Sequence, residues 1–94
     1  MEGFSEYEWD ERKRLANIAK HRLDFQDVDL VFGDTHLALP ARVVGEELRH
    51  LAIGRVGETA VAVIYTIRGR ALRIISMRKA REDERRLLHQ ALQR

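Results

Sequence analysis

The sequence predicts an α+β fold in which two N-terminal helices precede a four-stranded antiparallel meander, and a C-terminal helix follows it. Two observations support this prediction. Up to residue 33 the apolar residues recur at helical spacing, whereas four later segments have strand-like patterns separated by short, glycine-containing breaks. A chain of 94 residues can bury one hydrophobic core but not two. We therefore expect a single compact domain over residues 1–94.

The two helices at the start of the chain are each preceded by a capping residue. Asp10 caps the first helix, which continues to Lys20-His21, and Asp24 caps the second. We expect Gly33 to end the second helix in a left-handed conformation. Segment 7–9 allows a short extra strand before the first helix. The expected apolar stripes are Leu15, Ile18 and Ala19 in the first helix, and Phe25, Val28, Val31 and Phe32 in the second.

The strand-like segments of the second half are expected to pair in sequence order. Their breaks are short and contain glycine, as tight hairpins require. The third segment is apolar at both odd and even positions, which predicts a central strand with both faces covered. Pro40 cannot donate a hydrogen bond to a neighbouring strand, so its strand is expected at an edge of the sheet. The four predicted strands are 37–44, 48–56, 59–67 and 71–77.

The last helix is expected over residues 81–92. Three acidic residues lie in its first turn, where negative charge stabilises the helix dipole. Its predicted buried stripe is Leu87, Leu88, Ala91 and Leu92. Near the N-terminus, Phe4, Tyr7 and Trp9 are expected to fix the first helix to the core, or else to form a surface for a protein partner.

Composition and charge narrow the possible functions. The chain has no cysteine, and its four histidines lack metal-ligand spacing, so we expect no structural zinc. There is no secretory signal and no membrane-spanning segment, which predicts a cytoplasmic protein. Residues 1–50 carry 7 basic and 11 acidic side chains, whereas residues 51–94 carry 10 and 4. This asymmetry favours a basic face that meets an acidic partner or nucleic acid.

The end of the last strand is the first candidate for anion binding. Arg73 lies inside an apolar strand pattern, where a guanidinium is costly unless it meets an anion or a carboxylate. Arg78 and Lys79 follow directly. Arg73 and Arg78 are five positions apart, so a regular strand would point them to opposite faces. They can bind one phosphate together only if the strand bulges or ends between them.

Several short sequence motifs, taken together in their order and spacing, resemble those of the BrnT family of bacterial toxins over roughly residues 7–88. The resemblance implies a RelE-like fold, cleavage of RNA without a metal or other cofactor, and neutralisation by a BrnA antitoxin of a type II toxin-antitoxin operon. It also implies that the antitoxin covers the site and contributes operator DNA binding. The motifs are Trp9-Asp10-Glu11, Lys13, Asn17, Lys20-His21, Phe25, Gly45-Glu46-Glu47, Ala52-Ile53-Gly54, Val63-Ile64-Tyr65-Thr66, Arg73-Ile74-Ile75-Ser76-Met77-Arg78-Lys79-Ala80 and Glu84-Arg85.

Two positions depart from the family pattern. Arg22 stands where the family typically has glycine, which would alter the turn after the first helix if that turn needs a positive φ. Leu88 stands where the family typically has a tyrosine near the end of the last helix. This second change removes any role that such a tyrosine has in stacking or proton transfer.

Cleavage of RNA without a metal needs a proton acceptor for the 2′-hydroxyl, positive charge for the phosphorane and a proton donor for the leaving oxygen. The candidates also have structural interpretations: helix-end cations for Lys20 and His21, pairing with a carboxylate across the sheet for Arg73, a solvated strand end for Arg78 and Lys79, a solvated turn for Glu47, and core packing for Tyr65. Glu84 and Arg85 are equally well explained as exposed helix residues with intrahelical partners. The candidate catalytic residues are His21, Lys20, Glu47, Arg73 and Arg78; the candidate RNA-binding residues are Lys79, Arg81, Arg85 and Tyr65.

The leading hypothesis is therefore a ribonuclease toxin. A second hypothesis is a non-catalytic module that keeps the fold and the basic surface and binds nucleic acid or an antitoxin. A third is a corepressor that acts only together with its DNA-binding partner.

Overall fold

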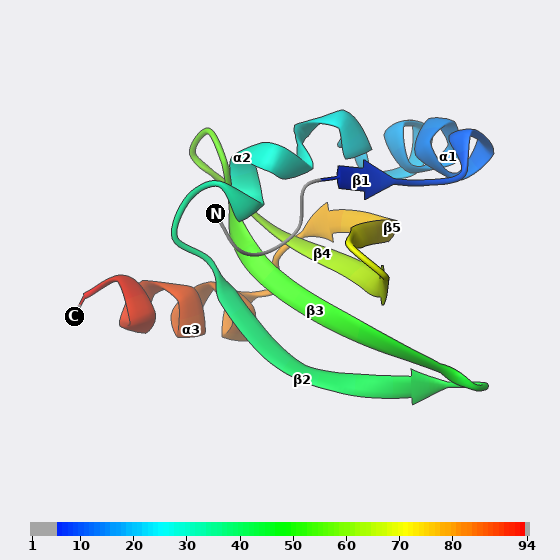
Figure 1. The fold of residues 1–94 in the computed structure, drawn as a ribbon. Helices are drawn as coiled ribbons and strands as arrows, with labels where there is room; N and C mark the ends of the chain where they lie inside the picture. Colours follow the sequence, from blue (N-terminus) through cyan, green and yellow to red (C-terminus); the bar gives the residue numbers. More distant parts are fainter. Residues whose placement is uncertain (1–5, 94) are drawn as a thin grey trace.

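The computed structural model describes residues 6–93, apart from the side chain at position 41, and contains the predicted α+β domain (Figure 1). Three helices, a short 3-10 helix and five strands follow one another along the chain. Their order is β1 (Glu6–Glu8), α1 (Glu11–His21), η1 (Phe25–Asp27), α2 (Val28–Phe32), β2 (Leu37–Val44), β3 (Glu47–Val56), β4 (Thr59–Arg68), β5 (Ala71–Lys79) and α3 (Glu82–Leu92).

The five strands form one sheet in the order β1-β5-β4-β3-β2. Strands β2 to β5 are the predicted antiparallel meander, while β1 is the extra N-terminal strand and pairs in parallel with β5. The predictions of a central β4 and of an edge strand containing Pro40 are confirmed. Gly45, Gly57 and Gly69 have φ between 59° and 65° in the three hairpin turns, as the glycine-containing breaks indicated.

The helices cover both faces of the sheet. Helices α1 and α2 lie over one face, and α3 lies on the other side at one end (Figure 1). The core under α1 and α2 is formed by Phe25, Val28, Val31, Ala52, Val61, Val63, Tyr65, Leu72, Ile74 and Met77. A smaller cluster of Ile53, Ala80 and Leu88 lies under α3. Each fully buried valine or leucine stabilises the fold by about 1.5–3 kcal/mol.

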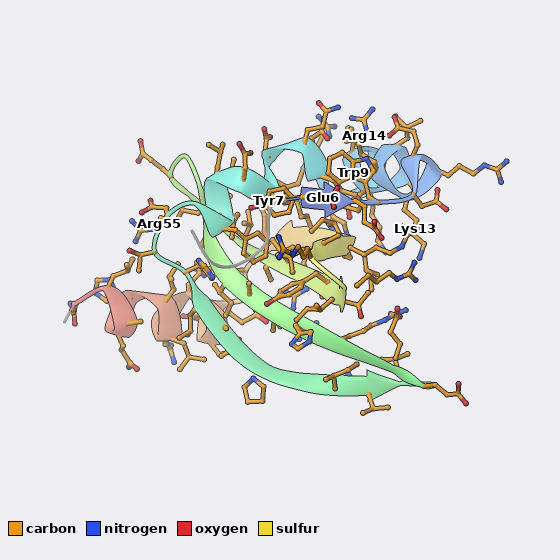
Figure 2. All side chains as sticks on the ribbon, viewed as in Figure 1. Glu6, Tyr7, Trp9, Lys13, Arg14 and Arg55 are labelled. Carbon is orange, nitrogen blue, oxygen red and sulfur yellow. The ribbon has the colours of Figure 1, made fainter. Side chains whose placement is uncertain are left out.

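The aromatic residues before α1 pack against the next helical segment. The Tyr7 ring stacks on Phe32 at a centroid distance of 5.9 Å, and Trp9 meets Phe25 edge-on at 6.2 Å (Figure 2). Phe4 lies outside the described residues. These contacts attach the start of α1 to the core.

Gly54 allows α2 to approach the sheet closely. A Cβ atom at this position would lie 2.8 Å from Val31 Cγ1, which is too close for any side chain larger than hydrogen. Gly54, near the C-terminal end of β3, therefore marks the point where α2 crosses the strand.

Three details of the helices differ from prediction. In α1 the buried residue is Asn17, while Leu15 is 54% exposed, because α1 lies beside β5 at one side of the sheet. In α3 the buried residues are Glu84 and Leu88, while Leu87 and Leu92 are exposed, because α3 covers only one end of the sheet. Gly33 ends α2 with φ −84° and not in a left-handed conformation.

Candidate functional site

A β-bulge in β5 brings the two predicted phosphate-binding arginines to one face of the sheet. Ile64 pairs with Ser76, but the next residue of β4, Tyr65, pairs with Ile74, so Ile75 is the extra residue. Arg73 therefore lies opposite Thr66, and Arg78 lies opposite Ala62. Since Thr66 and Ala62 are separated by an even number of positions, both arginines point to the face that α3 covers.

The C-terminus of α1 and the end of β5 together form a cleft of about 410 Å³. We call it the cationic cleft. It brings together five of the predicted site residues: two from α1, two from the end of β5, and the N-cap residue of α3. Its lining consists of Lys20, His21, Arg22, Arg78, Lys79 and Arg81. One histidine among five basic side chains is a suitable arrangement for binding and protonating a phosphate ester.

Asn17 fixes the position of α1 beside β5. Its Nδ2 atom donates to the Leu23 carbonyl at 3.0 Å, and its Oδ1 atom accepts from the Met77 backbone N–H at 3.1 Å. Strand β1 pairs with β5 only at residues 71–73, so Met77 lies beyond that pairing and Asn17 provides its partner. Asn17 is one of the residues that carry the family resemblance, but no pattern in the sequence indicates this positioning role.

Arg78 is held in place by a buried carboxylate. Its Nη1 and Nη2 atoms donate to the two Glu84 oxygens at 2.8 and 2.9 Å, and Glu84 is 6% exposed. The Arg78 hydrogen bond is the main reason that the pKa of Glu84 is lowered, and burial opposes this shift. The same bond raises the pKa of Arg78.

Glu84 also caps α3, because it accepts a hydrogen bond from the Arg81 backbone N–H at 2.8 Å. The sequence suggested an exposed helix residue with intrahelical partners at this position. Acidic residues are common in the first turn of a helix, so the sequence contained no signal that this one reaches back to β5.

Arg22 follows α1 in a left-handed conformation, with φ 61° and ψ 28°. Its backbone N–H donates to the Ile18 carbonyl at 2.8 Å and thereby closes the helix end. The turn that glycine would make is therefore kept, at the conformational cost that arginine has at positive φ. Arg22 also lines the cleft. It was not predicted as a site residue, and the sequence indicated it only as a departure from the family pattern.

Replacing Arg22 by glycine is expected to stabilise the fold. The change removes the left-handed strain, which costs about 1–2 kcal/mol, and adds the smaller entropic cost of glycine. We expect the free energy of unfolding, measured by urea denaturation, to rise by about 1 kcal/mol. An Arg22→Ala variant keeps the strain and is the control; if it stabilised the protein equally, charge repulsion in the cleft and not backbone strain would be the cause.

The other predicted site residues lie outside the cationic cleft. Arg73 pairs with Glu8 of β1 at 3.4 Å, at the far side of the bulge. Glu47 lies in another cavity, where it pairs with Arg49 and Arg68 at 3.3 and 3.8 Å. Arg85 donates to the Ala80 carbonyl. Tyr65 is 8% exposed and packs between Phe32 and His50, which corresponds to the core interpretation.

Among residues 6–93, no three His, Asp or Glu side chains form a group that could hold a metal ion. No helix in the described part of the chain combines the length and the apolar character that crossing a bilayer requires.

A cleft lined by basic residues on a small α+β domain is typical of the class of proteins that bind polyanions such as nucleic acid. Residues 9–84 match the family described as the ribonuclease toxin BrnT of type II toxin-antitoxin systems. The chain is also 38% identical to the ribonuclease toxin BrnT of Brucella abortus in its crystal structure, with a TM-score of 0.67. That match covers 82% of this chain and 97% of the other. The search of curated proteins gave no match.

The chain therefore belongs to the BrnT family of type II ribonuclease toxins, and its α+β domain is a BrnT-like fold. Membership of this family implies ribonuclease activity, an RNA substrate and an antitoxin partner.

Proposed function

We propose that this protein is a cytoplasmic endoribonuclease that cleaves RNA through its 2′-hydroxyl group, without a metal ion, in the cationic cleft. The observation that carries the proposal is that His21 and five basic residues line one cleft, although they come from two separate parts of the chain, the end of α1 and the segment from the end of β5 to the N-cap of α3. His21 is half-buried at the end of α1, and histidine is the side chain best suited to exchange a proton near neutral pH.

The proposed reaction is an internal transfer at one phosphodiester. The 2′-oxygen attacks the adjacent phosphorus and gives its proton to a base, while the bond from phosphorus to the 5′-oxygen breaks and that oxygen receives a proton. The products are a 2′,3′-cyclic phosphate and a 5′-hydroxyl end. His21 is the proposed proton-transfer residue, and Lys20, Arg78, Lys79 and Arg81 stabilise the negative charge of the phosphorane.

Arg78 has the donors that this role requires. A guanidinium has five N–H groups, and the bonds of Arg78 to Glu84 and to the Lys79 carbonyl occupy three of them within the described structure. Two N–H groups therefore remain for phosphate oxygens. Glu84 fixes the orientation of the guanidinium, which reduces the entropy lost when phosphate binds.

The geometry gives less support to the other predicted site residues. Arg73 and Glu47 are engaged in ion pairs outside the cleft, Arg85 bonds to the backbone, and Tyr65 is buried. We therefore leave these four residues out of the proposed reaction. A BrnA-like antitoxin that covers the cleft and binds operator DNA is the proposed protein partner.

Incubation of the purified protein with RNA in excess EDTA tests the proposed reaction. We expect cleavage that yields cyclic-phosphate ends, and no cleavage of an oligonucleotide with a 2′-deoxyribose at the cut position. His21→Ala is expected to lower the rate about 100-fold, since general acid–base catalysis contributes at least this much.

His89→Ala is the matched control, because His89 lies on α3 and its ring bonds to Gln93 outside the cleft. Equal rates for the two histidine variants would contradict the role of His21. Loss of all cleavage in EDTA would contradict the mechanism, and RNA binding without cleavage under any condition would support the non-catalytic alternative.

A further inference from the structure

A second cavity, of about 360 Å³, adjoins the cationic cleft on the face of the sheet that bears α3. We call it the arginine groove. Its charged lining comes from three strands and from the N-cap and first turn of α3. The residues that matter for its chemistry are Arg42 of β2, Arg49 of β3, Arg78 of β5, and Arg81 and Glu84 at the start of α3.

Two of these arginines repel each other across the hairpin. Arg42 and Arg49 are register partners in the β2–β3 pair, so their side chains leave neighbouring strands side by side. Like charges directly opposite each other destabilise a sheet, and the cost is removed when an anion lies between them. Glu47 compensates part of this charge through its 3.3 Å contact with Arg49.

The groove as a whole has an excess of positive charge. It contains four guanidinium groups and one carboxylate, and that carboxylate, Glu84, already bonds to Arg78 with both oxygens. The uncharged part of the lining includes Pro40, Leu51 and Ile64. Cationic sides over an apolar floor suit a ligand with phosphates along its length and flat bases between them.

The groove and the cationic cleft adjoin each other, because Arg78 and Arg81 line both. We propose that the arginine groove is a second binding site for single-stranded RNA, which receives the nucleotides that flank the one cleaved in the cleft. Arg42 and Arg49 contact flanking phosphates, and the apolar floor receives a base. The inference rests on the proposed function and extends it from one phosphate to a path of several nucleotides.

The test compares Arg42→Gln/Arg49→Gln with a control, Arg55→Gln/Arg70→Gln, which removes the same charge from exposed positions elsewhere. Arg55 lies near the opposite end of β3 from Arg49 (Figure 2). The probe is a fluorescent ten-nucleotide RNA with 2′-O-methyl groups, which cannot be cut through the 2′-hydroxyl. We expect the groove variant to bind about tenfold more weakly at 0.1 M salt, with the slope of log affinity against log salt reduced by about 1.4.

Equal affinity of the groove variant and its control would overturn the inference and leave the groove to another ligand, such as an acidic segment of a protein. A reduced slope in both variants would also overturn it, because the effect would then be one of net charge. Thermal unfolding establishes that each variant is folded, and Arg42→Gln alone replaces the double variant if it is not. Failure of wild-type cleavage would contradict the proposed function without affecting this binding comparison.

Discussion

We expect expression of this protein to arrest bacterial growth, and we expect replacement of Arg78 by alanine to abolish that arrest. Arg78 is the residue shared by the cationic cleft and the arginine groove, and two of its N–H groups remain for phosphate. Loss of one well-placed donor to a developing negative charge reduces the rate of an enzyme by about 10²–10³-fold. Cleavage of RNA by the purified variant should fall by this factor.

The single variant alone does not separate activity from folding, because it leaves the buried Glu84 carboxylate without its partner. Arg78→Met/Glu84→Gln removes both charges. Its glutamine can still accept from the Arg81 N–H and so preserve the capping box of α3. We expect the double variant to recover the melting temperature of the wild type but to remain inactive.

The control for this series is Arg86→Ala, whose partner Glu82 is 69% exposed, so that little stability should be lost. Recovery of both stability and cleavage in the double variant would show that Arg78 has a structural role alone. Retention of full activity by a folded Arg78→Ala protein would equally remove Arg78 from the proposed reaction.

Among the proposed single substitutions, Glu84→Ala is expected to cause the largest decrease in the free energy of unfolding. The change leaves the Arg78 guanidinium, whose side chain is 21% exposed, without its carboxylate and removes the cap of α3. Breaking a buried ion pair costs about 3 kcal/mol or more, which in a domain of this size lowers the melting temperature by roughly 15 °C. Thermal unfolding at pH 7 measures the effect.

The loss of stability in the Glu84→Ala variant should depend on pH. The pKa of Glu84 in the folded protein is below its ordinary value of 4.5, chiefly because Arg78 bonds to the ionised form. The stability that Glu84 contributes is therefore present above about pH 4.5 and is lost as the pH falls through the lowered pKa. The difference in unfolding free energy between wild type and Glu84→Ala should be constant from pH 6 to 8 and shrink in acid. A difference that stays the same down to pH 2 would contradict the ion-pair explanation.

The sheet could be predicted because its determinants are local. The glycines of the three hairpins fix which strands are neighbours, and the apolar pattern of β4 on both faces fixes its central place. The N-cap residue Asp10 likewise accepts from the Arg12 N–H and begins α1 as expected.

The predictions that were wrong or incomplete concern contacts between residues that lie far apart in the sequence. The spacing of Leu15 predicts a core position, but Leu15 is exposed because α1 is placed by Asn17, whose partner Met77 lies sixty positions away. The bulge at Ile75 has no glycine or proline to mark it, so the sequence showed only that a bulge was needed for Arg73 and Arg78 to share a face. The buried ion pair of Glu84 could not be predicted for the same reason, because its partner Arg78 belongs to β5.

During translation, the Asn17–Met77 hydrogen bond can form only after the ribosome has synthesised residue 77. Translation produces α1 early, but the strand edge that receives it is made only when the final quarter of the chain appears. A nascent chain therefore exists for most of its synthesis without a complete cleft. The proposed nuclease site is therefore complete only after β5 and α3 have been synthesised, and an antitoxin that is already present could then bind the completed surface.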